Sequence, residues 1–191
     1  MSDFALVLND MRDHYKKNLG KKSVTRFRPV EEVHDDILFA AVTDDVAVSG
    51  EEVLAQLKIT AKAGATATAT AIQNGITDAT GVLKDHGATS SAVDDFISKM
   101  NKQREDAKQN ASKTIDKIYD EAISIGKEHP KLQGLIAGLM DTVSQLFHEL
   151  VSKIVDFVAG IVKSVVAWLN TAWKSINTFF SSVGSWVSGW F

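Results

Sequence analysis

The stretch from Asp141 to Ser188, DTVSQLFHELVSKIVDFVAGIVKSVVAWLNTAWKSINTFFSSVGSWVS, decides the fold of this chain. Its polar residues recur with an average spacing of about 3.6 residues, which is the repeat of an α-helix. Nearly every position between them is Leu, Ile, Val, Phe or Trp, and all four tryptophans lie in the last 24 residues of the sequence. We therefore expect a very long, amphipathic C-terminal helix from Pro130 onward, with an apolar surface much wider than its polar stripe.

The remaining sequence predicts an all-α protein, an elongated helical bundle of about five helices. The third and fourth helices, each roughly 55 Å long at 1.5 Å per residue, are expected to pair as an antiparallel hairpin. The fifth is longer than this hairpin, so it either projects beyond it or folds back as a helical hairpin near Ala159 and Gly160. The expected helices cover residues 3–19, 29–41, 49–86, 91–129 and 130–191. They fall into three units: short N-terminal helices with a basic connector at 1–48, the hairpin at 49–129 and the apolar C-terminal region at 130–191.

Local signals set the expected ends of these helices. Asp3 can cap the first helix, and Pro29 suits the first turn of the second. Ser49 to Glu52 reads as a capping box for the third helix, and Ser91 to Asp94 reads as a cap for the fourth. The alternation of Ala and Thr from Ala63 to Ala71 is also typical of a strand, but the helical period on both sides favours a helix. Its small residues would let a neighbouring helix pack closely.

The distribution of charge separates the C-terminal region from the rest of the chain. The net charge is -3, yet residues 131–191 carry four lysines against three acidic residues, and no charge follows Lys174. The Ala-rich third and fourth helices offer only a narrow apolar stripe with which to cover the fifth. Because burying one Leu, Ile or Phe contributes roughly 1.5–3 kcal/mol, a large uncovered surface would not be stable in water. We expect it to be covered by self-folding, by oligomerisation or by lipid.

The composition of the C-terminal region favours lipid. Its polar stripe changes from charged residues to small uncharged ones, which cost less to desolvate than ions, and tryptophan suits the headgroup boundary of a bilayer. The polar residues favour interfacial insertion over a conventional transmembrane span. The sequence therefore predicts a protein that releases this helix to a membrane or lipid surface and forms homo-oligomers there, with a pore as one outcome. The expected membrane anchors are Trp168, Trp173, Phe179, Phe180, Trp186, Trp190 and Phe191. The polar stripe that would face water or partner helices is Ser175, Thr178, Ser181, Ser185 and Ser188. The expected headgroup contacts are Lys16, Lys17, Lys21, Lys22, Arg26 and Arg28.

Two other hypotheses stay open for the same region. One is a self-assembling structural protein, such as a filament, shell or coat, that polymerises through this helix, and the other is an effector whose target is a protein helix. We do not expect an enzyme, because H-E-x-x-H, glycine-rich phosphate loops and nucleophile elbows are absent. We expect no cofactor, small-molecule substrate or metal, since the densest donor cluster, Glu31 to Asp36, spreads its ligands around a helix. The overall acidity argues against a nucleic-acid partner.

The sequence gives a weaker indication of location. It contains no cysteine, which excludes disulfides and thiolate metal sites. The apolar run from Phe4 to Leu8 is short and preceded by Asp3, so we expect no secretory signal peptide. We expect a cytoplasmic protein, or one exported by a non-classical route, that associates with membranes when active. His148, beside Glu149 on the polar stripe, is a candidate acid-sensitive element.

Overall fold

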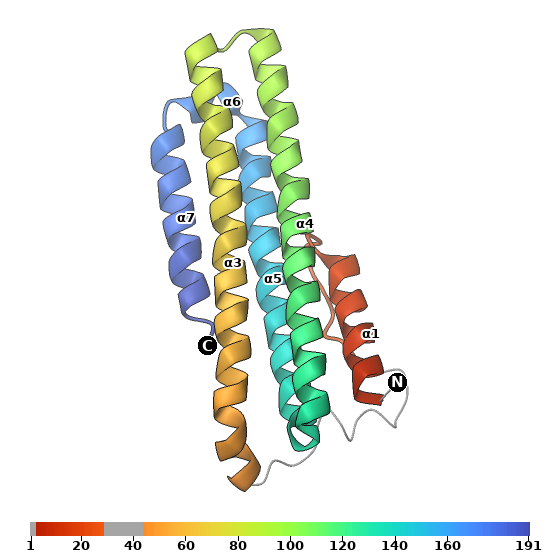
Figure 1. Ribbon diagram of the computed structural model, residues 1–191. Coiled ribbons are helices and arrows are strands. Elements are labelled where there is room, and N and C mark those ends of the chain that lie inside the picture. Colours follow the sequence, from red (N-terminus) through yellow and green to blue (C-terminus); the bar gives the residue numbers. More distant parts are fainter. Residues whose placement is uncertain (1–2, 29–43) are drawn as a thin grey trace.

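The computed structural model describes residues 3–28 and 44–191, and within these residues every regular element is a helix. The prediction of an all-α helical bundle is confirmed, whereas the helix expected at 29–41 lies outside the described residues. The elements shown in Figure 1 are α1 (Asp3–Asn18), α3 (Asp44–His86), α4 (Ser90–Glu128), the 3-10 turn η2 (Pro130–Leu132), α5 (Gln133–Lys163), α6 (Val165–Leu169) and α7 (Ala172–Ser188).

Helices α3 and α4 form the antiparallel hairpin that the sequence predicts (Figure 1). Buried residues recur along both helices, from Leu57 to Leu83 on α3 and from Phe96 to Ala122 on α4. The helices are joined at Gly87, whose φ of +73° lies in the left-handed region. Side chains with a Cβ atom rarely adopt that conformation, so glycine suits the end of α3.

The predicted starts of these two helices are wrong by a few residues. Helix α3 begins at Asp44, so the capping-box pattern from Ser49 to Glu52 lies inside the helix. Helix α4 begins at Ser90, and its cap is Thr89, whose hydroxyl accepts a hydrogen bond from the main-chain N–H of Ala92 at 3.3 Å. Consecutive hydroxyl residues precede this helix, so the sequence alone does not select one of them as the cap.

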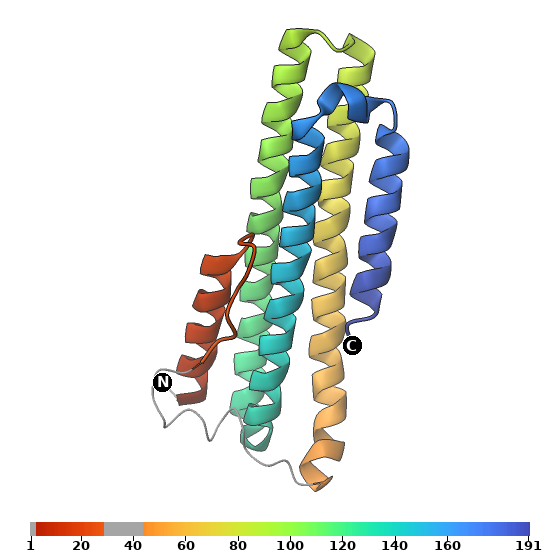
Figure 2. The ribbon, with the colours of Figure 1, turned by 180° about the vertical axis from the view of Figure 1, so that it is seen from behind.

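Helix α5 packs along both helices of the hairpin and forms the centre of the core. It also contacts α1 on one flank and α7 on the other, so it needs apolar side chains around most of its circumference (Figures 1 and 2). Its buried residues are Ile136, Ala137, Leu139, Met140, Val143, Ser144, Leu146, Phe147, His148, Leu150, Val151, Ile154, Val155, Val158 and Ile161.

The very long C-terminal helix is a wrong prediction. Helix α5 ends at Lys163, and Ser164, with φ -150° and ψ 55°, leaves the helical conformation. After the short α6 the chain turns again, and α7 returns antiparallel to α5 alongside α3 (Figure 2). The reversal lies after Lys163 and not at Ala159 and Gly160, which stay within α5. Periodicity misses this break because α5 and α7 each have the helical repeat and the break falls among polar residues that continue it.

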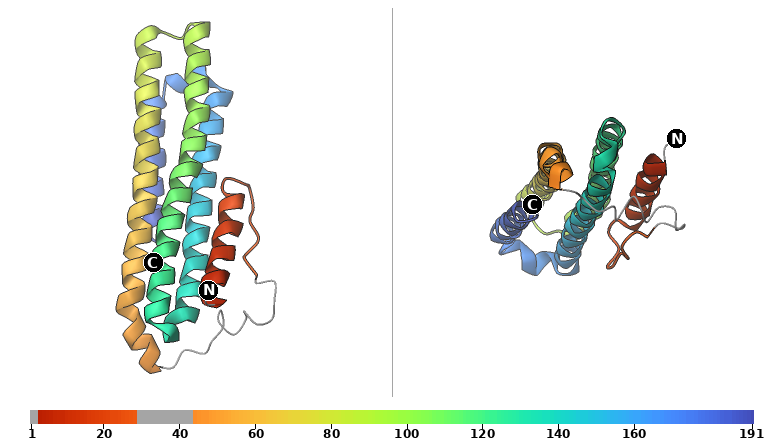
Figure 3. Two further views of the ribbon diagram at one scale, coloured as in Figure 1. Left: turned by 45° about the vertical axis from the view of Figure 1, so that its right-hand side comes forward. Right: turned by 90° about the horizontal axis from the view of Figure 1, so that it is seen from below.

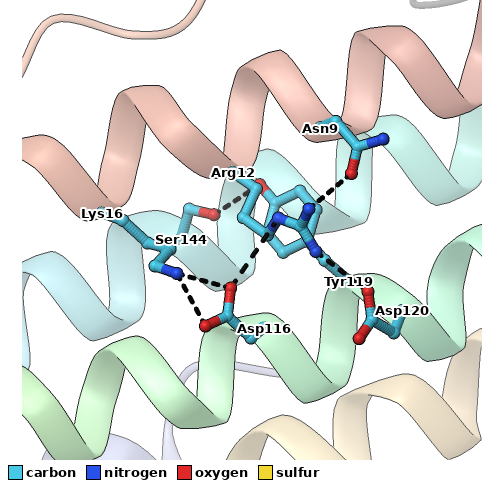
Figure 4. A network of polar contacts seen from close by, with 7 residues as sticks. All are labelled: Asn9, Arg12, Lys16, Asp116, Tyr119, Asp120 and Ser144. Carbon is cyan, nitrogen blue, oxygen red and sulfur yellow. Dashed lines mark hydrogen bonds and ion pairs between the residues drawn. The ribbon is translucent and has the colours of Figure 1, made fainter.

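Helix α1 packs across α4 and α5 through a buried apolar face that runs from Phe4 to Tyr15. Ion pairs hold it on α4 (Figure 4): Arg12 Nη1 lies 2.9 Å from Asp120 Oδ1, and Lys16 Nζ lies 2.6 Å from Asp116 Oδ2. These pairs fix the register of α1 on the bundle.

A buried polar contact links α4 to α5 beneath α1 (Figure 4). The hydroxyls of Tyr119 and Ser144 are 2.7 Å apart, and both residues are buried. Burial raises the pKa of Tyr119 well above its usual range, so the hydroxyl keeps its proton and can donate this hydrogen bond.

The apolar surface is covered within a single chain, contrary to the expectation that its own helices would be too poor to cover it. Among the residues whose burial the structure describes, 3–28 and 50–191, the large apolar side chains that remain exposed are scattered over four helices: Leu6, Ile59, Val82, Val166 and Trp173. The expectation from the sequence counted only α3 and α4 as helices that could cover the C-terminal region. The fold adds α1 on one side and folds α7 back on the other, which together close the core.

Candidate functional site

The most distinctive part of the molecule is its C-terminal arm, by which we mean residues 165–191, comprising α6, α7 and the residues after α7. The arm lies on the edge of the bundle, where α7 rests mainly on α3 and to a lesser extent on α5 (Figures 1 and 2). Its inner face is apolar and buried: Ala172, Ile176, Phe180, Val183 and Val187. The arm is therefore an amphipathic helix at the edge of the bundle, and its buried residues belong to the same core as those of the other helices.

Aromatic side chains fill the contact between the arm and α5. The rings of Phe157 and Phe179 stack with centroids 4.0 Å apart, and Phe180 meets Phe157 edge-on at 6.0 Å. Trp168 lies against Phe96 of α4 with ring centroids 5.9 Å apart, and its indole N–H is buried without a hydrogen-bond partner among the described residues. An unsatisfied buried donor makes this docking less favourable.

Lysines supply the polar contacts that hold the arm. Lys62 Nζ on α3 donates hydrogen bonds to the main-chain oxygens of Ser188 at 2.9 Å and Phe191 at 3.5 Å. The ammonium groups of Lys84 and Lys153 lie over the rings of Trp173 and Trp186, at 4.9 and 5.0 Å from the ring centroids.

The arm and α1 are held by different kinds of interaction. Within residues 3–28 and 44–191, no ion pair and no side chain to side chain hydrogen bond joins the arm to the rest of the protein. Helix α1, in contrast, is fixed by ion pairs to α4. Apolar packing thus dominates the docking of the arm, and such packing specifies a binding partner less strictly than paired charges do.

After Lys174, which is itself exposed, the outer face of the arm is uncharged, and this uncharged surface continues onto α3. Lys174 is the last charged residue of the arm, and α3 carries no charge between Lys62 and Asp78. The contacts of Lys62 with Ser188 and of Lys84 with Trp173 place these two segments side by side. Together they form what we call the uncharged face.

A shallow groove of about 770 Å³ runs along the α3 part of the uncharged face. Its exposed residues are mostly Ala and Thr, with Ile59 at one end, 61% exposed. The sequence analysis treated the Ala and Thr positions as a close-packing surface, and only some of them, such as Ala65 and Ala69, are buried. The run without charges from residue 63 to 77 is the signal that could have identified this face.

The predicted membrane anchors are brought together, mostly on the inner side of the arm. Phe180 is buried, Trp173 is 42% exposed, and the other anchors are partly buried: Trp168, Phe179, Trp186, Trp190 and Phe191. The predicted polar stripe lies outside, with Thr178, Ser181, Ser185 and Ser188 exposed and Ser175 partly so. While the arm is docked, its hydroxyl groups are exposed to water and most of its aromatic surface faces the bundle.

The predicted headgroup contacts are not next to the anchors. They lie on α1 and the connector after it, on the opposite side of the bundle from α7 (Figure 3). Lys16 is held in its ion pair with Asp116, and Arg26 lies 3.9 Å from Asp141. The remaining four are exposed: Lys17, Lys21, Lys22 and Arg28. The two groups therefore cannot meet one flat surface while the arm stays docked.

The structure and the comparisons with known proteins supply no further class of site. No helix among residues 3–28 and 44–191 has the length and hydropathy of a membrane-spanning segment. The same residues contain no cluster of three or more potential metal ligands, and the donor-rich run from Glu31 to Asp36 lies outside them. Searches among protein families, curated proteins and solved structures found no match to this chain.

Proposed function

We propose that this protein binds membranes or lipid surfaces by releasing its C-terminal arm from the bundle. The observation that carries the proposal is the way in which the arm is docked. It is an amphipathic helix with an aromatic inner face, held by apolar packing and lysine contacts and by no ion pair within the described residues. A lipid surface can replace this apolar environment, whereas it could not replace a network of paired charges.

The energetics favour lipid as the receiving environment. Exposing Ile176, Phe180, Val183 and Val187 to water would cost roughly 6–12 kcal/mol, at 1.5–3 kcal/mol for each large apolar side chain. This cost keeps the arm docked in water. At a bilayer interface the same side chains are buried again, and the outer face beyond Lys174 can approach the headgroups without desolvating an ion.

Release of the arm also uncovers the apolar surface of α3 and α5 beneath it, including Phe157. A second copy could cover this surface, so the proposal includes assembly on the membrane, with a pore as one possible product. The exposed cations on α1 and the connector would assist docking to anionic lipid, at roughly 1 kcal/mol each near such a surface. Once the arm is released, it no longer constrains the orientation of the bundle, and these cations can then contact the headgroups.

Vesicle binding by the full chain tests the proposal. We expect co-sedimentation with anionic or zwitterionic vesicles, a blue shift of tryptophan emission and leakage of vesicle contents. Phe157→Ala should speed vesicle binding, because it removes the α5 ring that packs on Phe179 and Phe180 and leaves the anchors of the arm unchanged. Asp116→Asn is the matched control, since it loosens α1 and should leave the rate on zwitterionic vesicles unchanged. Absence of binding to both kinds of vesicle from about pH 5 to pH 8 would reject the proposal.

The uncharged face supports a second candidate function, self-assembly into a filament, shell or coat. Small Ala and Thr side chains along the groove on α3 allow another helix to approach closely, and the charged residue that lines it, Lys62, already bonds the main chain of the arm. Size-exclusion chromatography and electron microscopy without lipid separate the two functions. This candidate requires large regular assemblies in buffer and no vesicle leakage.

A further inference from the structure

A cleft of about 380 Å³ lies between α5 and the connector of residues 19–28 that follows α1. His148 of α5 lines this cleft, although the residue is only 5% exposed. Its Nδ1 atom is buried and has no hydrogen-bond partner among the described residues. A neutral ring tolerates this position, whereas a protonated ring would place a charged, unpaired N–H donor there.

The ring lies where α1 ends and the connector folds over α5. Burial lowers the pKa of His148, and the main chain of Asn18, the last residue of α1, lies close enough to the ring to offset part of that shift. The connector is held to its surroundings by the hydroxyl of Ser152, which donates to the carbonyl of Lys21 at 3.1 Å, and by the hydroxyl of Tyr15, which accepts from the N–H of Phe27 at 3.4 Å. These weak contacts hold the connector against α5 over His148, and we call this contact between the connector and α5 the seam.

The charges that face the cleft do not compensate an imidazolium. Helix α5 contributes Glu149, Lys153 and Asp156, the connector contributes Lys22 and Arg26, and α1 contributes the phenol of Tyr15. From α4, Lys108 lies against Gly20 and adds another cation nearby. Arg26 is paired with Asp141 at 3.9 Å, and Lys108 is paired with Glu105 at 2.9 Å. This leaves two cations, Lys22 and Lys153, with the two carboxylates, so no excess negative charge faces the ring.

The balance of local effects favours the neutral ring. Burial lowers the pKa of His148 and is the largest effect, while the main chain of Asn18 and the charge of Glu149 oppose it. Because the pKa falls below its ordinary value of 6.5, the closed seam is fully stable above that pH. Its stability decreases as the pH falls from there towards the lowered pKa.

We propose that His148 is an acid-sensitive latch: its protonation releases the end of α1 and the connector from α5. Opening lets water reach the imidazolium and frees the cations of the connector from the bundle surface. The latch acts on the end of α1 and the connector, and its opening is measured without lipid, so it does not depend on the lipid-binding function proposed above.

Hydrogen exchange of the full chain tests the latch. Amide exchange would be compared at about pH 7.5 and about pH 5.5, after correction for the intrinsic pH dependence of exchange. We expect the opening equilibrium of α1 to increase by up to about tenfold for each pH unit below 6.5, the slope for one proton, while α4 and α7 change little. The pH dependence of α1 should disappear in His148→Phe and in His148→Gln, two variants that remove the proton while one keeps apolar packing and the other polarity.

His14→Gln provides the matched control, because His14 is also on α1 and bonds the carbonyl of Thr25 at 2.8 Å. It should keep the pH dependence. An α1 that exchanges alike at both pH values would overturn the proposal, as would a pH dependence that survives both His148 variants or is lost in His14→Gln.

Discussion

Replacing Phe180 by Ala should loosen the arm without unfolding the bundle. Phe180 is 6% exposed on the inner face of α7, with its ring centroid 4.9 Å from that of Phe179 and 6.0 Å from that of Phe157. Truncating a buried Phe to Ala typically costs 3–5 kcal/mol. We take about 3 kcal/mol here, because α7 lies at the edge of the bundle and its surroundings can relax.

A loss of this size increases the population of the undocked arm about a hundredfold. Hydrogen exchange measures it directly, because amides report the free energy of the smallest opening that exposes them. We expect amides of α7 to exchange about a hundredfold faster while those of α4 are nearly unchanged. Ser181→Ala, on the exposed side of the same helix, should behave as wild type. Equal acceleration in all helices would refute the reasoning, since it would mean that α7 opens only with the whole bundle.

Three further predictions concern the rest of the fold. Gly126→Ala should destabilise the protein by about 1–3 kcal/mol, because the new Cβ would lie 2.1 Å from the ring of Phe4; thermal or denaturant unfolding measures this. Tyr119→Phe should cost about 1–3 kcal/mol in the same assay, since it leaves the buried hydroxyl of Ser144 without its closest partner. Thr89→Ala should cost about 1 kcal/mol through the lost helix cap, whereas Thr89→Ser should be nearly neutral.

The helices whose buried residues form one narrow stripe were predictable from the sequence. The helix expected at 3–19 corresponds to α1, whose buried residues run from Phe4 to Tyr15, and the helix expected at 49–86 lies within α3, whose buried residues run from Leu57 to Leu83. In such helices the helical repeat of the apolar residues is also the pattern of burial.

The path of the chain after Lys163 was not predictable in this way. A wide apolar surface shows that a helix has neighbours on several sides, but it does not identify them. Neighbours of α5 come from opposite ends of the sequence, and the break at Ser164 leaves no mark in the period. The sequence therefore indicated the wide apolar surface of α5, but not the helices that cover it.

The candidate site was predictable in composition but not in geometry. The sequence identified the aromatic residues of the arm and its outer hydroxyls. It placed the basic connector in the same function, although α1 and α7 lie on opposite sides of the bundle (Figure 3). Helical periodicity gives the face of a helix and carries no information on which side of a bundle that helix packs.

The central claim, that release of the arm is what allows lipid binding, is tested most directly by tethering the arm. The chain has no cysteine, so Lys62→Cys and Ser188→Cys introduce a unique pair where Lys62 Nζ lies 2.9 Å from the main-chain oxygen of Ser188. A short bis-maleimide can link the pair, and the unlinked double variant is the matched control. The account predicts vesicle binding with a tryptophan blue shift for the unlinked protein and neither for the linked one. Equal binding by the linked and unlinked proteins would contradict it.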